Sequence, residues 1–147
     1  MIAAVLSQAM LTSKTEGNFN NHIGVPKTIF DISESTEASV VEMGMNHLGE
    51  ISKLTKAAKP DIAVLTCIGV SHIENLGSRE NILKAKLEIL ESMSEDSPLI
   101  INVDNDILSN IEKLTSKQSY TTCIIFQCIS QISYASNIGI NMDSPST

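Results

Sequence analysis

The sequence predicts an α/β protein of three layers, in which a mostly parallel sheet is covered by helices on both faces. Two observations lead to this prediction. Segments typical of strands alternate with segments typical of helices from residue 39 to residue 126, and short connections join them. The strand segments are unbroken apolar runs, as strands buried inside a parallel sheet are. With 147 residues the chain has about the length of one domain.

The expected elements can be given in chain order. Residues 1–11 have the apolar spacing of a helix, and the Gly- and Asn-rich residues 14–26 are expected to form a loop. The tail after Phe126 has two possible structures, one or two further strands or a frayed end. Strands are expected at 39–45, 62–68, 99–103 and 121–126, and helices at 47–59, 79–93 and 105–117. Ser78 is predicted to cap the helix that begins at Arg79, and Pro60 to end the helix before it.

Composition excludes several classes of function. Seventeen Asp and Glu against ten Lys and Arg give a net charge of -7, and Arg79 is the only arginine, which argues against nucleic acid as a partner. The cysteines Cys67, Cys123 and Cys128 are odd in number and lack CxxC spacing, which argues against a disulfide framework or a zinc knuckle. Cys67 is expected to be an inert buried thiol. This use of cysteine fits a reducing cytoplasm best. No apolar run reaches the roughly 18 residues of a membrane span, so no membrane partner is expected.

Polar residues stand at the carboxyl ends of three predicted strands, where ligands bind in open parallel sheets. Glu42 lies inside the run VVEMGM, where an ionised carboxylate needs a partner or a cation. His72 follows the next strand, and Asn102 and Asp104 stand at the end of the one after it. A single carboxylate at a strand end is more often a helix cap or a loop ligand than a catalyst. Their occurrence at three strand ends makes a metal site an alternative of equal weight.

Lys86 lies at the centre of an apolar stripe on the helix predicted at 79–93. The stripe consists of Ile82, Leu83, Ile89, Leu90 and Met93. Lys84 lies on another face, among glutamates, and is expected to be solvated. Two outcomes remain open for Lys86: its ammonium reaches out to solvent, which is the commoner outcome, or its amine is held near the strand ends with Glu42 and His72.

Three familiar catalytic patterns do not occur in these 147 residues. The chain has no G-x-x-x-x-G-K-[ST] phosphate loop, and it has neither a G-x-S-x-G elbow nor a Cys/His nucleophile pattern. His22 and His47 are expected to be surface or capping residues.

Several motifs in register resemble the central domain of the Mur ligases. They are KTEGNFNNHIGVP (14–26), VVEMGMNHLGEI (40–51), SHIENLGS (71–78), KAKLEIL (84–90) and INVDND (101–106). The resemblance covers residues 1–122 and is greatest to the branch of the family that adds D-alanyl-D-alanine. It implies an ATP-dependent ligase of peptidoglycan precursor synthesis, which activates the carboxylate of a UDP-linked muramoyl peptide as an acyl phosphate and joins it to the dipeptide.

The resemblance also implies a catalytic metal site. Glu42 and His72 match magnesium ligands of the family, and Lys86 matches the lysine that is carbamylated to become a third ligand. The central position of Lys86 on its apolar stripe agrees with this role, because carbamylation needs a neutral amine. ATP and Mg²⁺ are the cofactors implied.

Two further groups of residues match family motifs. Thr15, Asn20 and Asn21 match the loop that contacts the UDP-linked substrate. Asn102 and Asp104 match a strand-end motif near the nucleotide.

The chain departs from the family pattern in three places. The phosphate loop and the two flanking domains are not found in it, and residues 124–133 do not follow the pattern. We therefore expect residues 1–126 to be a partial central domain, residues 127–147 a divergent tail, and the chain alone to be inactive. The alternatives are a fragment of a sibling Mur ligase or of a folylpolyglutamate synthase, and a non-catalytic α/β remnant.

Overall fold

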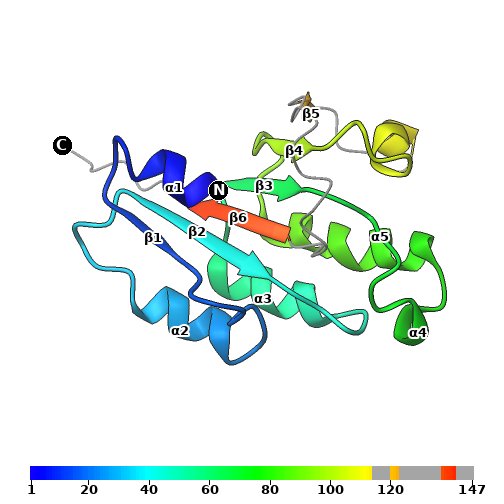
Figure 1. Cartoon of the computed structure of the whole chain (residues 1–147), viewed down its shortest axis with the longest axis horizontal. Helices are drawn as coiled ribbons and strands as arrows, with labels where there is room; N and C mark the ends of the chain where they lie inside the picture. The colour runs from blue at the N-terminus through cyan, green and yellow to red at the C-terminus, as the bar shows by residue number, and fades with distance from the viewer. Residues whose placement is uncertain (114–119, 123–136, 142–147) are drawn as a thin grey trace.

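A computed structural model describes residues 1–113, 120–122 and 137–141. Six strands form one sheet in the order β1-β2-β6-β3-β4-β5 (Figure 1). The strands are β1 (Thr12–Lys14), β2 (Ala38–Met43), β3 (Ile62–Leu65), β4 (Leu99–Ile101), β5 (Tyr120–Thr122) and β6 (Asn137–Asn141). The neighbouring pairs β1/β2, β3/β4 and β4/β5 are parallel, whereas β6 runs antiparallel to both β2 and β3. The expected α/β class with a mostly parallel sheet is confirmed.

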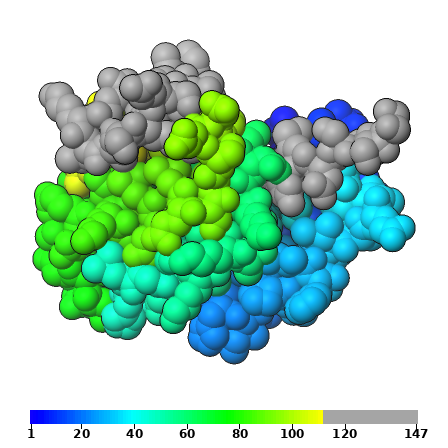
Figure 2. Space-filling view, turned by 180° about the vertical axis from the view of Figure 1, so that it is seen from behind, coloured from blue at the N-terminus to red at the C-terminus, as the bar shows by residue number. Residues whose placement is uncertain are grey.

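The helices lie between the strands in sequence. They are α1 (Ile2–Leu6), α2 (Gly24–Phe30), α3 (Glu50–Ala58), α4 (Ile73–Leu76), α5 (Arg79–Leu87) and the 3-10 helices η1 (Glu88–Ser92) and η2 (Leu108–Lys113). Helix α3 contacts both α2 and α5, so that the three form a layer along the sheet (Figure 1). Figure 2 shows this layer from behind, from the blue of α2 to the green of α5. In the described residues, no helix is long and apolar enough to cross a membrane.

The core lies between this helical layer and one face of the sheet. Alternate strand residues point to the same face, and Val41 and Met43 of β2 lie in one buried cluster with Leu65 of β3. Ile51 of α3 and Ile82 of α5 belong to the same cluster, and both are at most 1% exposed. The apolar stripes that predict α3 and α5 are therefore the faces that pack on the sheet.

The first part of the chain contains two elements where a loop is predicted. Helix α1 ends at Leu6 rather than near residue 11, and β1 and α2 lie within or beside the expected loop 14–26. Strand β1 has only three residues and is defined by its pairing, with Thr12 opposite Ala38. The prediction was wrong here because so short a strand has no periodicity of its own.

The later helices are shorter than predicted. Ser78 caps α5 as expected, since its hydroxyl accepts the N–H of Asn81 at 3.3 Å, but the α-helix ends at Leu87 and continues as η1. The helix predicted at 105–117 is the 3-10 helix η2 in its described part, and residues 114–119 lie outside the description. Asn105 Oδ1 accepts the N–H of Leu108 at 3.1 Å, the same capping contact that Ser78 makes with Asn81 at α5, so Asn105 marks the start of this helical region.

Strand β6 belongs to the tail whose structure the sequence left open. It lies between β2 and β3, and Ile138 pairs with Glu42 on one side and with Val64 on the other. Residues 123–126 of the expected strand 121–126, with Cys123, lie outside the described residues, as do Cys128 and the divergent residues 124–133.

Candidate functional site

Glu42 stands one residue before the end of β2 and is held by the loop that follows β1. Its Oε1 accepts a hydrogen bond from Asn20 Nδ2 at 2.9 Å, and its backbone N–H donates to Thr15 Oγ1 at 2.9 Å. The backbone carbonyl of Asn20 in turn accepts the N–H of Gly44 at 2.7 Å. The structure thus brings Thr15 and Asn20 to Glu42, and this explains how a half-buried carboxylate is tolerated in an apolar strand.

The same loop approaches the backbone so closely that two positions need glycine. A Cβ at Gly44 would lie 2.8 Å from the side chain of Asn20, and a Cβ at Gly24 would lie 2.2 Å from the carbonyl oxygen of Phe19. The loop therefore packs directly against the backbone at the end of β2 and at the start of α2.

Asn21 has a local role in this structure. Its Oδ1 accepts the backbone N–H groups of Ile23 and Gly24, both at 3.0 Å, and so satisfies donors at the start of α2. Asn21 itself is exposed. Its contact with a substrate stays a prediction.

Lys86 does not reach out to solvent. It is 2% exposed, and its Nζ donates to the backbone carbonyl of Cys67 at 2.9 Å, just beyond the end of β3. Burial lowers the pKa of Lys86 to about 8, against an opposing contribution from Cys67. The neutral amine is therefore more readily available near physiological pH than it is in an ordinary lysine. Lys84 is exposed, as predicted.

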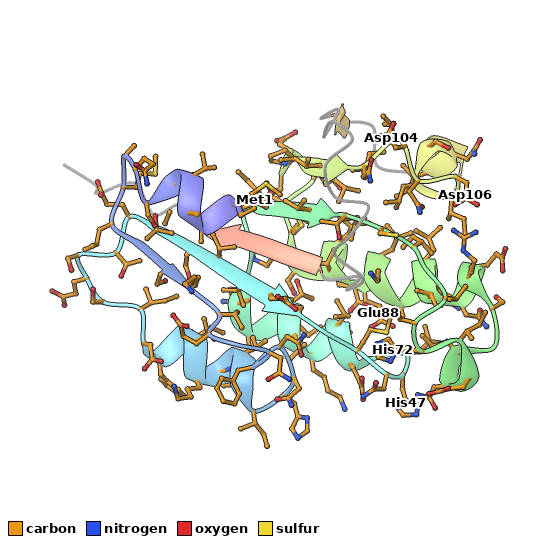
Figure 3. The ribbon with its side chains drawn as sticks, viewed as in Figure 1. Met1, His47, His72, Glu88, Asp104 and Asp106 are labelled. Atoms are coloured by element: carbon orange, nitrogen blue, oxygen red, sulfur yellow. The ribbon has the colours of Figure 1, made fainter. Side chains whose placement is uncertain are left out.

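His72 is exposed and caps the short helix α4 with a left-handed backbone, at φ 66°. Its carbonyl accepts the N–H groups of Asn75 and Leu76, both at 3.0 Å. Figure 3 draws His72, His47 and Glu88 on the side of the view toward which β2 and β3 point. His47 and His22 are exposed as expected, and His47 Nδ1 lies 3.5 Å from the carboxylate of Glu50.

Asn102 and Asp104 form a polar turn at the end of β4. Asn102 Nδ2 donates to the carbonyl of Thr66 at 3.1 Å, and Asn102 Oδ1 accepts the N–H of Asp104 at 3.0 Å. The Asn102 side chain therefore ties the turn to the chain that leaves β3. Asp104 is exposed beside it.

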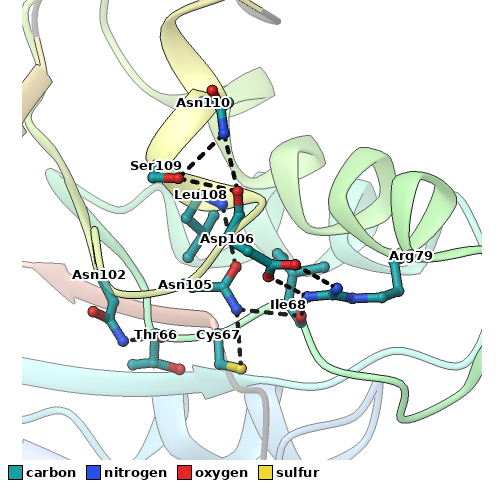
Figure 4. Close-up of polar contacts among 10 residues, drawn as sticks. All are labelled: Thr66, Cys67, Ile68, Arg79, Asn102, Asn105, Asp106, Leu108, Ser109 and Asn110. Atoms are coloured by element: carbon teal, nitrogen blue, oxygen red, sulfur yellow. Dashed lines mark hydrogen bonds and ion pairs between the residues drawn. The ribbon is translucent and has the colours of Figure 1, made fainter. Parts of the chain in front are cut away.

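A second polar cluster at these strand ends was not predicted (Figure 4). Arg79 donates to both carboxylate oxygens of Asp106, at 2.7 and 2.6 Å, and to the carbonyl of Ile68 at 2.6 Å. This hydrogen bonding lowers the pKa of Asp106 and raises that of Arg79. Asn105 Nδ2 donates to the same carbonyl at 3.3 Å and lies 3.6 Å from Cys67 Sγ (Figure 4). Cys67 is half-buried rather than buried as predicted. The one sequence signal for this cluster is that Arg79 is the only arginine.

The residues implied as metal ligands fit a hard cation in their chemistry. Among the described residues, no three His, Cys, Asp or Glu side chains form a group that could hold a metal ion. Glu42 and His72 therefore need a further ligand, and the buried amine of Lys86 supplies an oxygen ligand only as a carbamate. Its lowered pKa suits that reaction. The convergence of the three side chains stays a prediction.

The chain matches one protein family along almost its whole length. The profile described as Mur ligase middle domain matches residues 1–144. Among curated relatives, the chain is 50% identical over 117 residues to the UDP-N-acetylmuramoyl-tripeptide–D-alanyl-D-alanine ligase of Bacillus subtilis, a match that covers 80% of the chain and 26% of the relative. It is 39% identical over 106 residues to the Escherichia coli enzyme of that name, covering 72% of the chain and 24% of the relative.

Solved structures give the same result. Crystal structure I of MurF from Acinetobacter baumannii matches with a TM-score of 0.74 and 30% identity, covering 82% of this chain and 26% of that one. The MurF ligase of Thermotoga maritima in complex with ADP matches with a TM-score of 0.68 and 32% identity, covering 81% and 27%. The chain thus spans about a quarter of the length of its relatives.

Proposed function

The chain belongs to the Mur ligase family, and on this premise we propose that it forms the middle-domain region of a UDP-N-acetylmuramoyl-tripeptide–D-alanyl-D-alanine ligase. The reaction would join D-alanyl-D-alanine to a UDP-linked muramoyl tripeptide in the cytoplasm, at the expense of ATP, as a step in peptidoglycan precursor synthesis. The observation that carries the proposal is the buried amine of Lys86 at the carboxyl end of β3. A lysine on a helix that covers a sheet ordinarily keeps its ammonium group in contact with water, which Lys86 does not.

Lys86 would act as a carbamate. Its neutral amine attacks carbon dioxide, a nitrogen–carbon bond forms, and one proton leaves to solvent. The product is a carboxylate-like group in place of a cation. The pKa of about 8 makes the neutral amine available for this step, which an ordinary lysine would resist.

Glu42, His72 and the carbamylated Lys86 would hold Mg²⁺, which supplies charge neutralisation for phosphate groups when bound. Asn20 occupies Oε1 of Glu42, so its second oxygen, Oε2, is the one proposed to face the cation. Thr15 fixes the backbone of Glu42 at the same time.

The remaining implied residues would contact the substrates. The exposed Asn21, with Thr15 and Asn20 behind it, would meet the UDP-linked muramoyl peptide. Asn102 and Asp104 would lie near the nucleotide, where the exposed carboxylate of Asp104 is available to a hydroxyl donor. The Thermotoga maritima relative, whose structure is a complex with ADP, supports the use of a nucleotide by the ligase to which this region would belong.

A chimera tests the proposal as a whole. The matching region of this chain replaces the 117-residue counterpart in the Bacillus subtilis relative, and phosphate release and peptide product are measured with ATP, the UDP-tripeptide and the dipeptide. We expect an active chimera, a loss of at least about a hundredfold on Lys86→Ala, since a metal ligand is removed, and a change of less than about threefold on Lys84→Ala. An inactive chimera with native folding, or equal rates for the two variants, would refute the proposal.

A further inference from the structure

The start of α3 is capped by a residue from a distant part of the chain. Gly49 precedes the helix at φ 83° and has no side chain with which to cap it, although the first N–H groups of a helix need acceptors. The carboxylate of Glu88 supplies two such acceptors. Its Oε1 accepts the N–H of Gly49 at 2.7 Å, and its Oε2 accepts the N–H of Ser52 at 3.1 Å. One carboxylate thus spans the first turn of α3 from a position 39 residues after Gly49.

Glu88 lies two residues after Lys86, where α5 passes into η1. Lys86 points to the carbonyl of Cys67 at the end of β3, while Glu88 reaches the N-terminus of α3. A second contact joins η1 to α3: Thr55 Oγ1 donates a buried hydrogen bond of 2.8 Å to the carbonyl of Ile89. Lys86 at the end of α5 and Glu88 at the start of η1 therefore hold two different segments, the chain that leaves β3 and the start of α3.

The segment that Glu88 holds is the loop that leaves Glu42. This loop is bound at its beginning, where the N–H of Gly44 donates to Asn20, and at its end, where the N–H of Gly49 donates to Glu88. The carboxylate of Glu88 thus completes a series of contacts from Glu42 through its loop to the residue that directly follows α5, the helix of Lys86.

We propose that Glu88 is a positioning residue, which fixes the β2–α3 loop relative to Lys86 and so sets the spacing of Glu42 and Lys86 around a divalent cation. This rests on the proposed metal site. Glu88 itself does not touch the cation in this proposal; it acts through the backbone of Gly49 and Ser52.

The test uses Glu88→Gln in the 147-residue chain, with Glu91→Gln as the matched control. Glu91 also binds α3, through Ser52 Oγ at 2.6 Å and Lys56 at 3.3 Å, but it holds no backbone N–H of the loop. Mg²⁺ binding is measured by calorimetry in bicarbonate buffer, and the carbamate is followed by ¹³C NMR with labelled bicarbonate. Amide hydrogen exchange reports on Gly49 and Ser52.

We expect Glu88→Gln to raise the Kd for Mg²⁺ about tenfold, as the loss of outer-shell support does at metal sites, and to speed exchange at Gly49 and Ser52. Glu91→Gln should change the Kd less than about twofold.

A Kd for Glu88→Gln equal to that of the control overturns the positioning role while the metal site stands, and a purely structural role would lower the melting temperature without moving the Kd. If the unaltered chain neither binds Mg²⁺ nor forms the carbamate, the metal site and the role of Glu88 both fall. Should Glu88→Gln fail to fold, Glu88→Asp takes its place, because it keeps the charge but is one methylene too short to span both N–H groups.

Discussion

Asn20 Nδ2 lies 2.9 Å from Oε1 of Glu42, so the loop between β1 and α2 fixes the carboxylate at the end of β2. The two residues are 22 positions apart, and they are joined again through the Gly44 N–H, which donates to the Asn20 carbonyl. In the proposed ligase, this arrangement couples the substrate loop to a metal ligand. Movement of the loop on substrate binding would therefore shift the carboxylate of Glu42 directly.

Asn20→Asp should destabilise the fold by about 1–3 kcal/mol, because it places a second carboxylate where an amide N–H was donating and leaves Glu42 without that donor. Asn18→Asp, an equal change of charge at an exposed position in the same loop, is the control and should cost less than about 0.5 kcal/mol. Urea unfolding of both variants measures the difference. Equal midpoints would show that the Asn20–Glu42 bond contributes nothing.

The buried Lys86 predicts a pH dependence of stability. Its pKa is about 8 in the fold against 10.5 ordinarily, so between these values the unfolded chain binds more protons and stability rises with pH. Below pH 8 the buried Lys86 must carry its charge in the fold, and this lowers the free energy of unfolding by an amount on the order of 3 kcal/mol for a shift of this size.

Lys86→Met, which is similar in length and uncharged, should therefore be more stable than the unaltered chain at neutral pH, and the difference should vanish as the pH approaches 10.5. Unfolding midpoints in bicarbonate-free buffer from pH 6.5 to 10.5 measure it. A difference that stays constant across this range would mean that Lys86 keeps its ordinary pKa in the fold.

The parts of the fold that were predicted correctly are those with a local signal. The strands β2, β3 and β4 are visible in the sequence as unbroken apolar runs, because strands inside a parallel sheet are buried on both faces. Helix α5 is visible as an apolar stripe, because only one of its faces packs on the sheet. The stripe also placed Lys86 on the buried face, although it could not decide whether the amine would stay there.

The parts that were missed depend on residues distant in sequence. Strand β6 is defined by pairing with β2 and β3, and its antiparallel direction in an otherwise parallel sheet has no local signature. The pair of Arg79 and Asp106 spans 27 positions, and the bonds of Glu88 to α3 span 36 and 39. Such contacts exist only once the strands have brought the loops together.

Gly24 provides a test of the close approach beside Asn20. Alanine favours a helix over glycine by about 1 kcal/mol, yet Gly24→Ala in α2 should destabilise the chain by at least about 2 kcal/mol, because the new Cβ would overlap the Phe19 backbone. Gly69→Ala is the control: nothing lies within 4 Å of its Cβ, and the change should stay within about 0.5 kcal/mol. Chemical denaturation compares them. A stabilised Gly24→Ala variant would contradict the contact.

The ion pair of Arg79 with Asp106 predicts that the stability of the fold depends on salt concentration and changes in acid. Arg79→Lys keeps the charge but loses the paired bonds to Asp106 together with the bond to Ile68, so its melting temperature should fall. Asp106→Asn should also lower it. Because hydrogen bonding by Arg79 lowers the pKa of Asp106 in the fold, that loss is full above the ordinary value of 3.8 and disappears as the pH falls through the lowered pKa. Thermal melts from pH 7 down to 2.5, at low and high salt, measure both. Glu34→Gln, at an exposed position in the loop before β2, is the control and should show a smaller fall at pH 7; an equal fall would assign the effect to general surface charge.

His72 separates the demands of folding from those of the proposed reaction. Its φ of 66° is a conformation that costs a residue with a Cβ about 1 kcal/mol or more, and glycine adopts it freely. We expect His72→Gly to be more stable than His72→Ala by about 1 kcal/mol, since only the alanine variant keeps the strained backbone. Both variants should bind Mg²⁺ at least about tenfold more weakly than the unaltered chain, because both remove the imidazole. Melting curves and calorimetry on the three proteins provide the two measurements.

If both variants bind Mg²⁺ as the unaltered chain does, His72 is no ligand and its backbone conformation serves only the turn into α4. If instead binding falls equally in both while only stability distinguishes them, the strain at residue 72 is retained for the imidazole, because any requirement of the turn alone would be met better by glycine.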